Sequence, residues 1–207
     1  MSDLRLFLVR HAESEANARR VLDSLPPGMP LTAEGRRQAE DLADELASEP
    51  VVAVYASTAT RAQQTAAPVA ARHGLPVQIV DGVQEAFLGE LEGRDGLADL
   101  QRFEEVYASW YAGDLDHPLP GGETGQQVID RFLAALQPIV SASQDGAVVL
   151  VSHGAALRLV GARLAGDTTP GLAGTAYLPN TGRIVLRADP HAATGWQCLE
   201  WSGMQLG

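Results

Sequence analysis

The sequence predicts a three-layer α/β/α sandwich, with a mostly parallel central sheet, helices on both faces and an antiparallel edge near the C-terminus. First, apolar runs alternate with helix-like stretches along the 207 residues. Second, residues 147–151 form a continuous apolar run, which is typical of a parallel strand buried on both faces. Third, segments 183–187 and 196–201 close the chain and indicate an antiparallel pair.

In the first half of the chain, short β-rich runs alternate with helical spacing. The run at 4–9 predicts the first strand. Thr32 can cap a helix, and apolar residues follow it at helical spacing, at Ala39, Leu42, Ala43 and Leu46. Two further strands are predicted at 51–55 and 77–80, with a helix at about 60–73 between them.

The second half predicts three further helices and the buried strand. One helix covers part of 97–111, and another covers 155–164. A strongly amphipathic helix begins near Thr124. Its apolar face comprises Val128, Phe132, Leu136, Ile139 and Val140.

The length suits one domain, residues 1–207, with a core that needs no disulfide, and an insertion at about 86–122 is expected to cover the substrate pocket. Cys198 is the single cysteine, so no intrachain disulfide can form, and a reducing compartment is expected. The first apolar run, 6–9, is interrupted by Arg10 and His11 and is too short for a signal peptide or a membrane span. We therefore expect a cytoplasmic protein.

Charge excludes several classes of partner and of chemistry. The formal net charge of −11 disfavours binding to nucleic acid and to anionic membranes. All 15 residues counted as lysine or arginine are arginine, an absence of lysine that GC-rich coding explains most simply. It nevertheless excludes a Schiff base, a Walker-type phosphate loop and a lysine general base.

Two histidines follow predicted strands directly. Arg10 and His11 come after the first strand, and Ser152-His153-Gly154 comes after 147–151. Ligands of open α/β sheets bind beyond the carboxyl ends of the strands. If these two strands are neighbours in the sheet, both histidines face one crevice.

Such a crevice could transfer a phosphoryl group without a metal. Guanidinium groups of Arg10 and Arg61 suit a phosphoryl dianion, and they would keep His11 neutral and nucleophilic. His153 could stabilise the developing charge, and Glu85, just beyond the third strand, could protonate the leaving group. Each motif alone has a structural explanation, because His-Gly often forms a turn and a loop glutamate is usually solvated. We assign no role to His73, His117 or His191, and we expect no metal site and no cofactor.

Several segments, in order, together resemble the histidine phosphatase superfamily, also called phosphoglycerate mutase-like. Residues 8–17 (Leu-Val-Arg-His-Ala-Glu-Ser-Glu-Ala-Asn) resemble the family signature. The other matching segments are 31–39, 57–66, 85–93 (Glu85, then Leu-Gly-Glu-Leu-Glu-Gly), 120–123 (Pro-Gly-Gly-Glu) and 151–154 (Val-Ser-His-Gly). The resemblance spans about 4–187 and implies the sandwich fold.

The resemblance also implies roles for individual residues. His11 would be phosphorylated and Glu85 would act as general acid and then base. Arg10, Asn17, Arg61 and His153 would bind the phosphoryl group, with Ser14 and the backbone N–H of Gly154 as secondary contacts. Ala12 replaces a commoner glycine, and Leu91 stands where an aromatic residue is frequent, which affects the expected pocket shape rather than the chemistry.

These observations favour a phosphomonoesterase acting on a small phosphorylated metabolite, as a monomer or homodimer. The first alternative is a cofactor-dependent phosphoglycerate mutase, which by resemblance needs a lysine and paired arginines after the acid. Between Glu85 and Pro120 the only arginines are Arg94 and Arg102, so an apolar or mixed leaving group is expected. A catalytically silent binding protein and a phosphohistidine protein phosphatase are further alternatives. The presence of His11 and Glu85 disfavours the former, and the insertion disfavours the latter.

Overall fold

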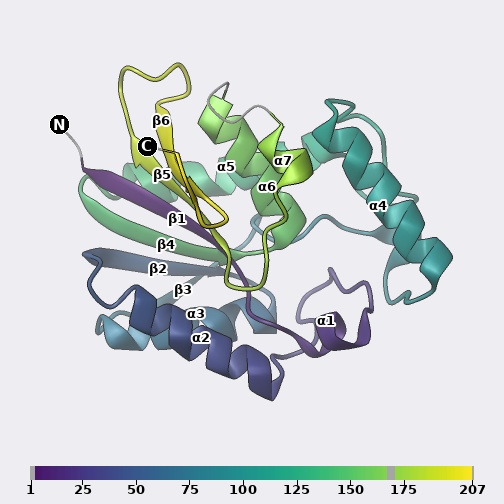
Figure 1. Ribbon diagram of the computed structural model, residues 1–207, viewed down its shortest axis with the longest axis horizontal. Coiled ribbons are helices and arrows are strands. Elements are labelled where there is room, and N and C mark those ends of the chain that lie inside the picture. The colour runs from purple at the N-terminus through teal and green to yellow at the C-terminus, as the bar shows by residue number, and fades with distance from the viewer. Residues whose placement is uncertain (1–2, 167–170, 207) are drawn as a thin grey trace.

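The computed structural model describes residues 3–166 and 171–206 and contains a seven-stranded sheet (Figure 1). The strand order is β3-β2-β4-β1-β5-β6-β7. Strands β1 to β4 are parallel, and β5 to β7 add an antiparallel edge, as predicted. The strands are β1 Leu4–Arg10, β2 Val51–Ser57, β3 Val77–Val80, β4 Gly146–Ser152, β5 Arg183–Ala188, β6 Trp196–Trp201 and β7 Met204–Gln205.

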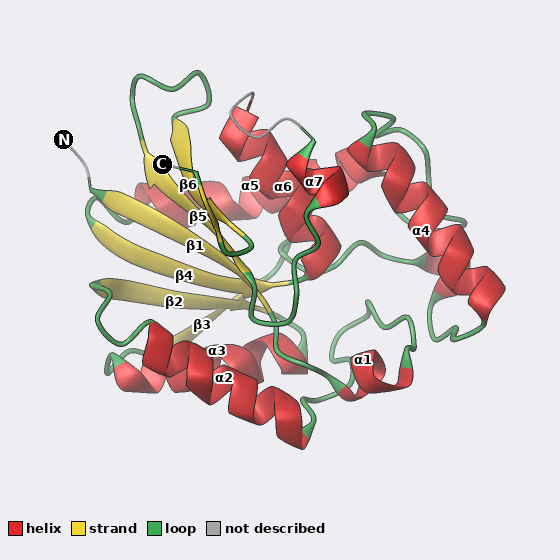
Figure 2. Cartoon of the chain, viewed as in Figure 1, coloured by secondary structure: helices red, strands yellow, loops and turns green. Residues whose placement is uncertain are grey.

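Helices cover both faces of the sheet, which confirms the three-layer prediction (Figure 2). One face packs against α2 (Ala33–Glu45) and α3 (Thr60–Arg72). The other packs against α5 (Gly125–Ser141) and α6 (Gly154–Ala165). Helix α4 (Leu97–Tyr111) extends this second cluster beyond the sheet.

The side chains of β1 alternate between the two cores. Leu6 and Leu8 pack with α5 and α6, whereas Phe7 and Val9 pack with α2 and α3. Strand β4 does the same, and residues 147–151 are all buried. An uninterrupted apolar run is therefore what a strand at the centre of two cores requires.

Neighbouring strands β1 and β4 send the chain to opposite faces of the sheet. Their parallel register pairs Arg10 with Ser152. After β1 the chain passes through α1 (Glu15–Arg19) to α2 on one face, whereas after β4 it enters α6 on the other. The ends of two such strands open a crevice between their connections, which is where ligands bind in open α/β sheets.

Four short elements were not predicted from the sequence: α1, η1 (Gly89–Leu91), α7 (Leu172–Thr175) and β7. Among the residues described, no helix is both long and apolar enough to cross a bilayer.

Candidate active site

The two histidines predicted to share a crevice do lie together. His11 and His153 follow the paired residues at the ends of β1 and β4. Their ring centroids are 5.2 Å apart, with the ring planes at 62°. His11 is 4% exposed and His153 is 1% exposed, so both residues are shielded from bulk water. The parallel register of β1 and β4 thus sets the distance between them.

The hydrogen bonds of His11 define which ring nitrogen carries the proton. Nδ1 lies 2.7 Å from the carbonyl oxygen of Ala12, which can only accept, so Nδ1 is the protonated nitrogen. Nε2 therefore keeps its lone pair, and Arg61 Nε donates to it at 3.1 Å. The lone pair on His11 Nε2 therefore points toward the guanidinium group of Arg61.

Arg61, in the first turn of α3, is the centre of the hydrogen-bond network. It is 2% exposed. Its Nη1 donates to the carboxylate of Asp23 at 3.2 Å, and its Nη2 donates to the Asp23 carbonyl at 2.8 Å and to His153 Nδ1 at 3.2 Å. Gly28, at φ +64°, leaves room for this group, because a Cβ there would lie 2.4 Å from Arg61 Nη1.

His153 has the opposite tautomer. Its Nδ1 accepts from Arg61, so Nε2 carries the proton and donates to Ser57 Oγ at 2.7 Å. Ser57 is the last residue of β2, the sheet neighbour of β4. The ends of three adjacent strands therefore orient the two imidazoles.

Both histidines are neutral near neutral pH. Burial lowers the pKa of His11 well below its ordinary value, and the charges of Arg61 and Arg10 lower it further. Burial also lowers the pKa of His153, again with contributions from Arg61, His11 and Arg10. A neutral imidazole with a free lone pair is the form that can act as a nucleophile.

Arg10 lies against the first turn of α6. Its Nη1 donates to the hydroxyl of Tyr177 at 2.6 Å and to the carbonyl of Leu178 at 2.8 Å. A Cβ at Gly154 would lie 3.2 Å from both Cδ and Nε of Arg10. A glycine at position 154 therefore permits the close approach of Arg10 to the helix.

Asn17 is fixed by a capping box at the start of α1. Ser14 Oγ accepts from Asn17 N, and Asn17 Oδ1 accepts from Ser14 N, each at 3.2 Å. Asn17 Oδ1 also accepts from Asn180 Nδ2 at 3.1 Å. This leaves the Nδ2 amide of Asn17 to face the cavity, while the hydroxyl oxygen of Ser14 serves as a helix cap.

Glu85 sits at the N-terminus of α6. Its Oε2 accepts from Ala155 N at 3.1 Å, and its Oε1 accepts from Ala156 N at 2.9 Å. These are two of the amides that a helix N-terminus leaves without intrahelical partners. The carboxyl group is thereby held on the same turn that contacts Arg10.

A buttress, formed by Arg131 and Glu123, holds the loop that carries Glu85. Arg131 Nη2 donates to the Glu85 carbonyl at 2.8 Å, and Nε and Nη2 form a two-point contact with Glu123. Burial would raise the pKa of Glu123, but its hydrogen bonds with Arg131 and with the Phe87 amide lower it. The buttress joins α5 to the Glu85 loop.

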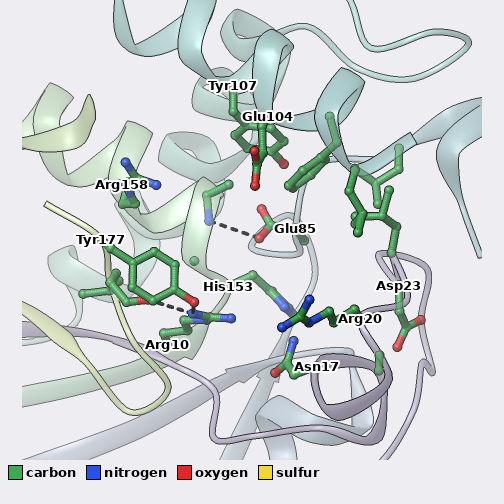
Figure 3. Close-up of a pocket in the computed structure, with 18 of the residues that line it drawn as sticks. Arg10, Asn17, Arg20, Asp23, Glu85, Glu104, Tyr107, His153, Arg158 and Tyr177 are labelled. Carbon is green, nitrogen blue, oxygen red and sulfur yellow. Dashed lines mark hydrogen bonds between the residues drawn. The ribbon is translucent and has the colours of Figure 1, made fainter. Parts of the chain in front are cut away.

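The predicted site residues line one cavity of about 1090 Å³ (Figure 3). They are Arg10, His11, Ser14, Asn17, Arg61, Glu85, His153 and Gly154. His73, His117 and His191 do not line it. Within the described ranges, no three His, Cys, Asp or Glu side chains lie close enough to hold a metal ion.

The model of the histidine phosphatase superfamily (branch 1) matches residues 6–202 of the chain. The chain belongs to this superfamily.

Relatives of this histidine phosphatase chain include enzymes with two different names. The adenosylcobalamin/alpha-ribazole phosphatase of Escherichia coli K12 is 35% identical over 170 residues, which cover 79% of this chain and 80% of that protein. A probable phosphoglycerate mutase, GpmB, of Salmonella choleraesuis is 33% identical over 155 residues, which cover 74% of this chain and 71% of that protein. The PE-PGRS family protein PE_PGRS11 of Mycobacterium tuberculosis is 32% identical over 214 residues, but the match spans only 36% of its length.

A solved structure shares the histidine phosphatase fold along the whole chain. The putative alpha-ribazole-5'-P phosphatase of Escherichia coli K-12 superimposes with a TM-score of 0.76 at 28% identity. The superposition covers 99% of this chain and 98% of that one.

Sequence reasoning missed several residues of this histidine phosphatase site. Asp23 accepts from Arg61, and Asn180 donates to Asn17. Arg131 donates to the backbone of the loop that carries Glu85. Arg158 also lines the cavity. The Pro-Asn-Thr-Gly turn before β5 was a usable signal for Asn180, because it adjoins the strand that pairs with β1. The others have no local signal, since their contacts depend on the packing of distant segments.

Proposed function

We propose that the protein is a metal-independent phosphomonoesterase that transfers the phosphoryl group of a small metabolite to His11 and then to water. The observation that carries this proposal is the unprotonated Nε2 of a neutral His11, which accepts a hydrogen bond from Arg61 inside the cavity that Glu85 also lines. A guanidinium-lined cavity with a nucleophile and a carboxyl group matches the requirements of phosphoryl transfer through a covalent intermediate.

The first step forms the phosphohistidine. Arg10, Arg61, Asn17 and the Gly154 amide bind the phosphoryl oxygens. His153 joins them as a donor after a change of tautomer, with its proton on Nδ1 and the hydroxyl of Ser57 donating to Nε2. Arg61 Nε then donates to a phosphoryl oxygen instead of to His11, which frees the Nε2 lone pair for attack in line with the leaving oxygen. The Nε2–P bond forms, the P–O ester bond breaks, and protonated Glu85 gives its proton to the departing alkoxide. The Ala12 carbonyl, which accepts from Nδ1–H, stabilises the positive charge that develops on the ring.

The second step releases phosphate. Glu85, now a carboxylate, accepts a proton from a water molecule while the oxygen of that water attacks phosphorus. The Nε2–P bond breaks, and the electron pair returns to His11. Inorganic phosphate leaves, and both side chains regain their starting protonation states.

The segment 86–122, which contains η1 and α4, is proposed as the wall of the leaving-group pocket within a single domain. Its residues Leu88, Phe103 and Tyr107 line the cavity.

The mutase reaction remains the second candidate, because one relative carries the name of a probable phosphoglycerate mutase. A mutase must bind a second anionic group of its substrate while it shields the phosphohistidine from water. Against this, Arg94 and Arg102 do not line the cavity, and the sequence contains no lysine. The silent binding protein is disfavoured because the nucleophile, the acid and both phosphate arginines line one cavity.

We expect the purified protein to hydrolyse p-nitrophenyl phosphate equally well with and without EDTA, within about twofold, because the proposed charge stabilisation comes from guanidinium groups. Release of nitrophenol gives the rate. A parallel reaction with 2,3-bisphosphoglycerate and a phosphoglycerate isomer tests for mutase activity. Loss of hydrolysis in EDTA, or isomerisation faster than hydrolysis, would overturn the proposal.

Glu85→Gln should slow hydrolysis of an alkyl phosphate by about 10²- to 10³-fold and of p-nitrophenyl phosphate by less than about tenfold. Nitrophenolate can leave without being protonated, whereas an alkoxide must receive a proton as the P–O bond breaks. Steady-state kcat on both substrates measures the difference. Glu90→Gln is the matched control, because Glu90 is exposed on the same segment. Equal losses on both substrates would contradict the role of Glu85 as the acid.

A further inference from the structure

The proposed acid, Glu85, lies on an irregular loop, so neither a helix nor a sheet fixes its position. The loop covers 81–88, between the end of β3 at Val80 and the start of η1 at Gly89. Backbone carbonyls in such a segment have no ladder of partners, and they need other donors where water is excluded. The donors that this loop receives therefore determine where the acid lies.

Arg131 of α5 donates to three carbonyls of the loop. Its Nη1 donates to Gly82 at 2.8 Å and to Gln84 at 2.9 Å, and its Nη2 donates to Glu85 at 2.8 Å. The other two N–H groups, one on Nε and one on Nη2, bind the carboxylate of Glu123 at 2.7 and 2.8 Å. A guanidinium has five N–H groups, so all of its donors are occupied. Arg131 also lies outside the cavity lining, so any effect on the reaction must pass through the loop.

Ser152 joins the same loop to the strand that carries His153. It is completely buried, and its Oγ donates to the Val83 carbonyl at 2.6 Å. Ser152 is the last residue of β4, directly before His153, and it pairs with Arg10 in the sheet. The loop is thus anchored to α5 on one side and to β4 on the other. These two anchors set the distance between the backbone of Glu85 and the proposed phosphoryl site.

Glu123, to which the proposed reaction assigns no role, completes the anchoring. Its Oε2 accepts from Phe87 N at 2.8 Å, and its own backbone N donates to the Phe87 carbonyl at 3.0 Å. Phe87 lies two residues after Glu85. The buttress of Arg131 and Glu123 therefore binds the backbone both at the acid and just beyond it.

Proton transfer depends steeply on where the acid lies. A general acid must be within hydrogen-bond reach of the leaving oxygen, and a misplacement of about 1 Å can slow a reaction about 10²-fold. The carboxyl group of Glu85 rests on the amides of Ala155 and Ala156, whereas the buttress holds its backbone. Both ends of the Glu85 side chain are therefore fixed.

We infer that Arg131 is a positioning residue that holds Glu85 within reach of the leaving-group oxygen and contacts no substrate itself. This role rests on the proposed function and extends it to a residue outside the cavity. Loss of Arg131 should weaken protonation of the leaving group and spare the groups that bind the phosphoryl oxygens. A general loss of folded protein would instead lower the rates for all substrates by the same factor.

Arg131→Gln should lower kcat/KM for glycerol 3-phosphate, an alkyl ester, about tenfold to a hundredfold. The loss for p-nitrophenyl phosphate should be less than about threefold, because nitrophenolate needs no proton. The ratio kcat/KM is measured because it reports the steps up to departure of the leaving group. Arg131→Lys should recover part of the alkyl rate, because it keeps a cation beside the carbonyls but loses the fork. Ser152→Ala, which removes one hydrogen bond to the loop, should show a smaller loss with the same selectivity.

The decisive comparison introduces Arg131→Gln into the Glu85→Gln variant. If Arg131 acts only through Glu85, the double variant should hydrolyse the alkyl ester as slowly as Glu85→Gln alone, within about twofold. Independent roles of the two residues would multiply the two losses.

Arg183→Gln is the matched control, because Arg183 is also ion-paired, has the same 25% exposed side chain as Arg131 and does not line the cavity. It should leave both rates unchanged. Equal losses on both esters in Arg131→Gln, or multiplied losses in the double variant, would overturn the inference. If Arg131→Gln does not fold, as judged by circular dichroism, Ser152→Ala enters the same comparison with the same deciding outcomes. A wild type that hydrolyses neither ester, or a Glu85→Gln variant without a selective loss, would overturn the proposed function and this role with it.

Discussion

His11→Ala should lower kcat for p-nitrophenyl phosphate by about 10⁴- to 10⁶-fold, because no other described side chain offers a lone pair at that point of the cavity. His153 lies beside His11, but in the proposed mechanism it binds the phosphoryl oxygens rather than attacking phosphorus. Rapid quenching with ³²P-labelled substrate should label the wild-type protein and leave His11→Ala unlabelled. The two readouts test the nucleophile and the intermediate separately.

The control for this variant is His191→Ala, which removes an exposed imidazole that does not line the cavity. It should retain the wild-type rate and labelling. Substantial activity or labelling in His11→Ala would move the nucleophile elsewhere and end the proposed mechanism.

Arg61→Gln should lower kcat/KM by about 10³-fold, the scale reported for arginines that stabilise a transferring phosphoryl group. One guanidinium here contacts His11, His153 and Asp23 at once, so the variant loses a proposed phosphate ligand and the orientation of both rings. Arg72→Gln is the control on the same helix. Arg72 pairs with Asp44 at the surface, and such exposed pairs contribute little. A loss below about tenfold in Arg61→Gln would remove Arg61 from the phosphoryl site.

The same variant should also shift the pH dependence. His11 must be neutral to attack, so kcat/KM falls as pH drops through the pKa of His11. Burial is the largest cause of its lowered pKa, followed by Arg61 and then Arg10. Removing the charge of Arg61 raises that pKa, so the acid limb should move to higher pH. It should stay below the ordinary imidazole pKa, because burial and Arg10 remain. An acid limb that stays in place would show that another group limits the rate.

The long elements of the fold were predictable because each carries a periodic signal. Residues 147–151 predicted β4, and the apolar face that follows Thr124 predicted α5, which a capping box with Gln127 begins. Elements such as α1 and α7 are too short for their spacing to be read. Their ends depend on local caps, of which Ser14 with Asn17 is one.

The meeting of the two histidines was predictable for a related reason. His11 and His153 directly follow strands, so their meeting depended only on β1 and β4 being neighbours, which the parallel register confirms. Arg158 could not be placed in this way. Whether a helical arginine faces solvent or a cavity depends on α4 packing against α6, and no local pattern in the sequence encodes that contact.

The opposite connections of β1 and β4 also bear on how such enzymes diverge. The groups proposed to handle phosphoryl transfer are anchored to strand ends and the first turns of α3 and α6, where a backbone shift would disturb the sheet itself. The wall proposed to face the leaving group comes largely from α4, which lies beyond the sheet. Under the proposed mechanism, substitutions confined to this one peripheral helix should change which phosphate ester is accepted without disturbing the groups at the strand ends.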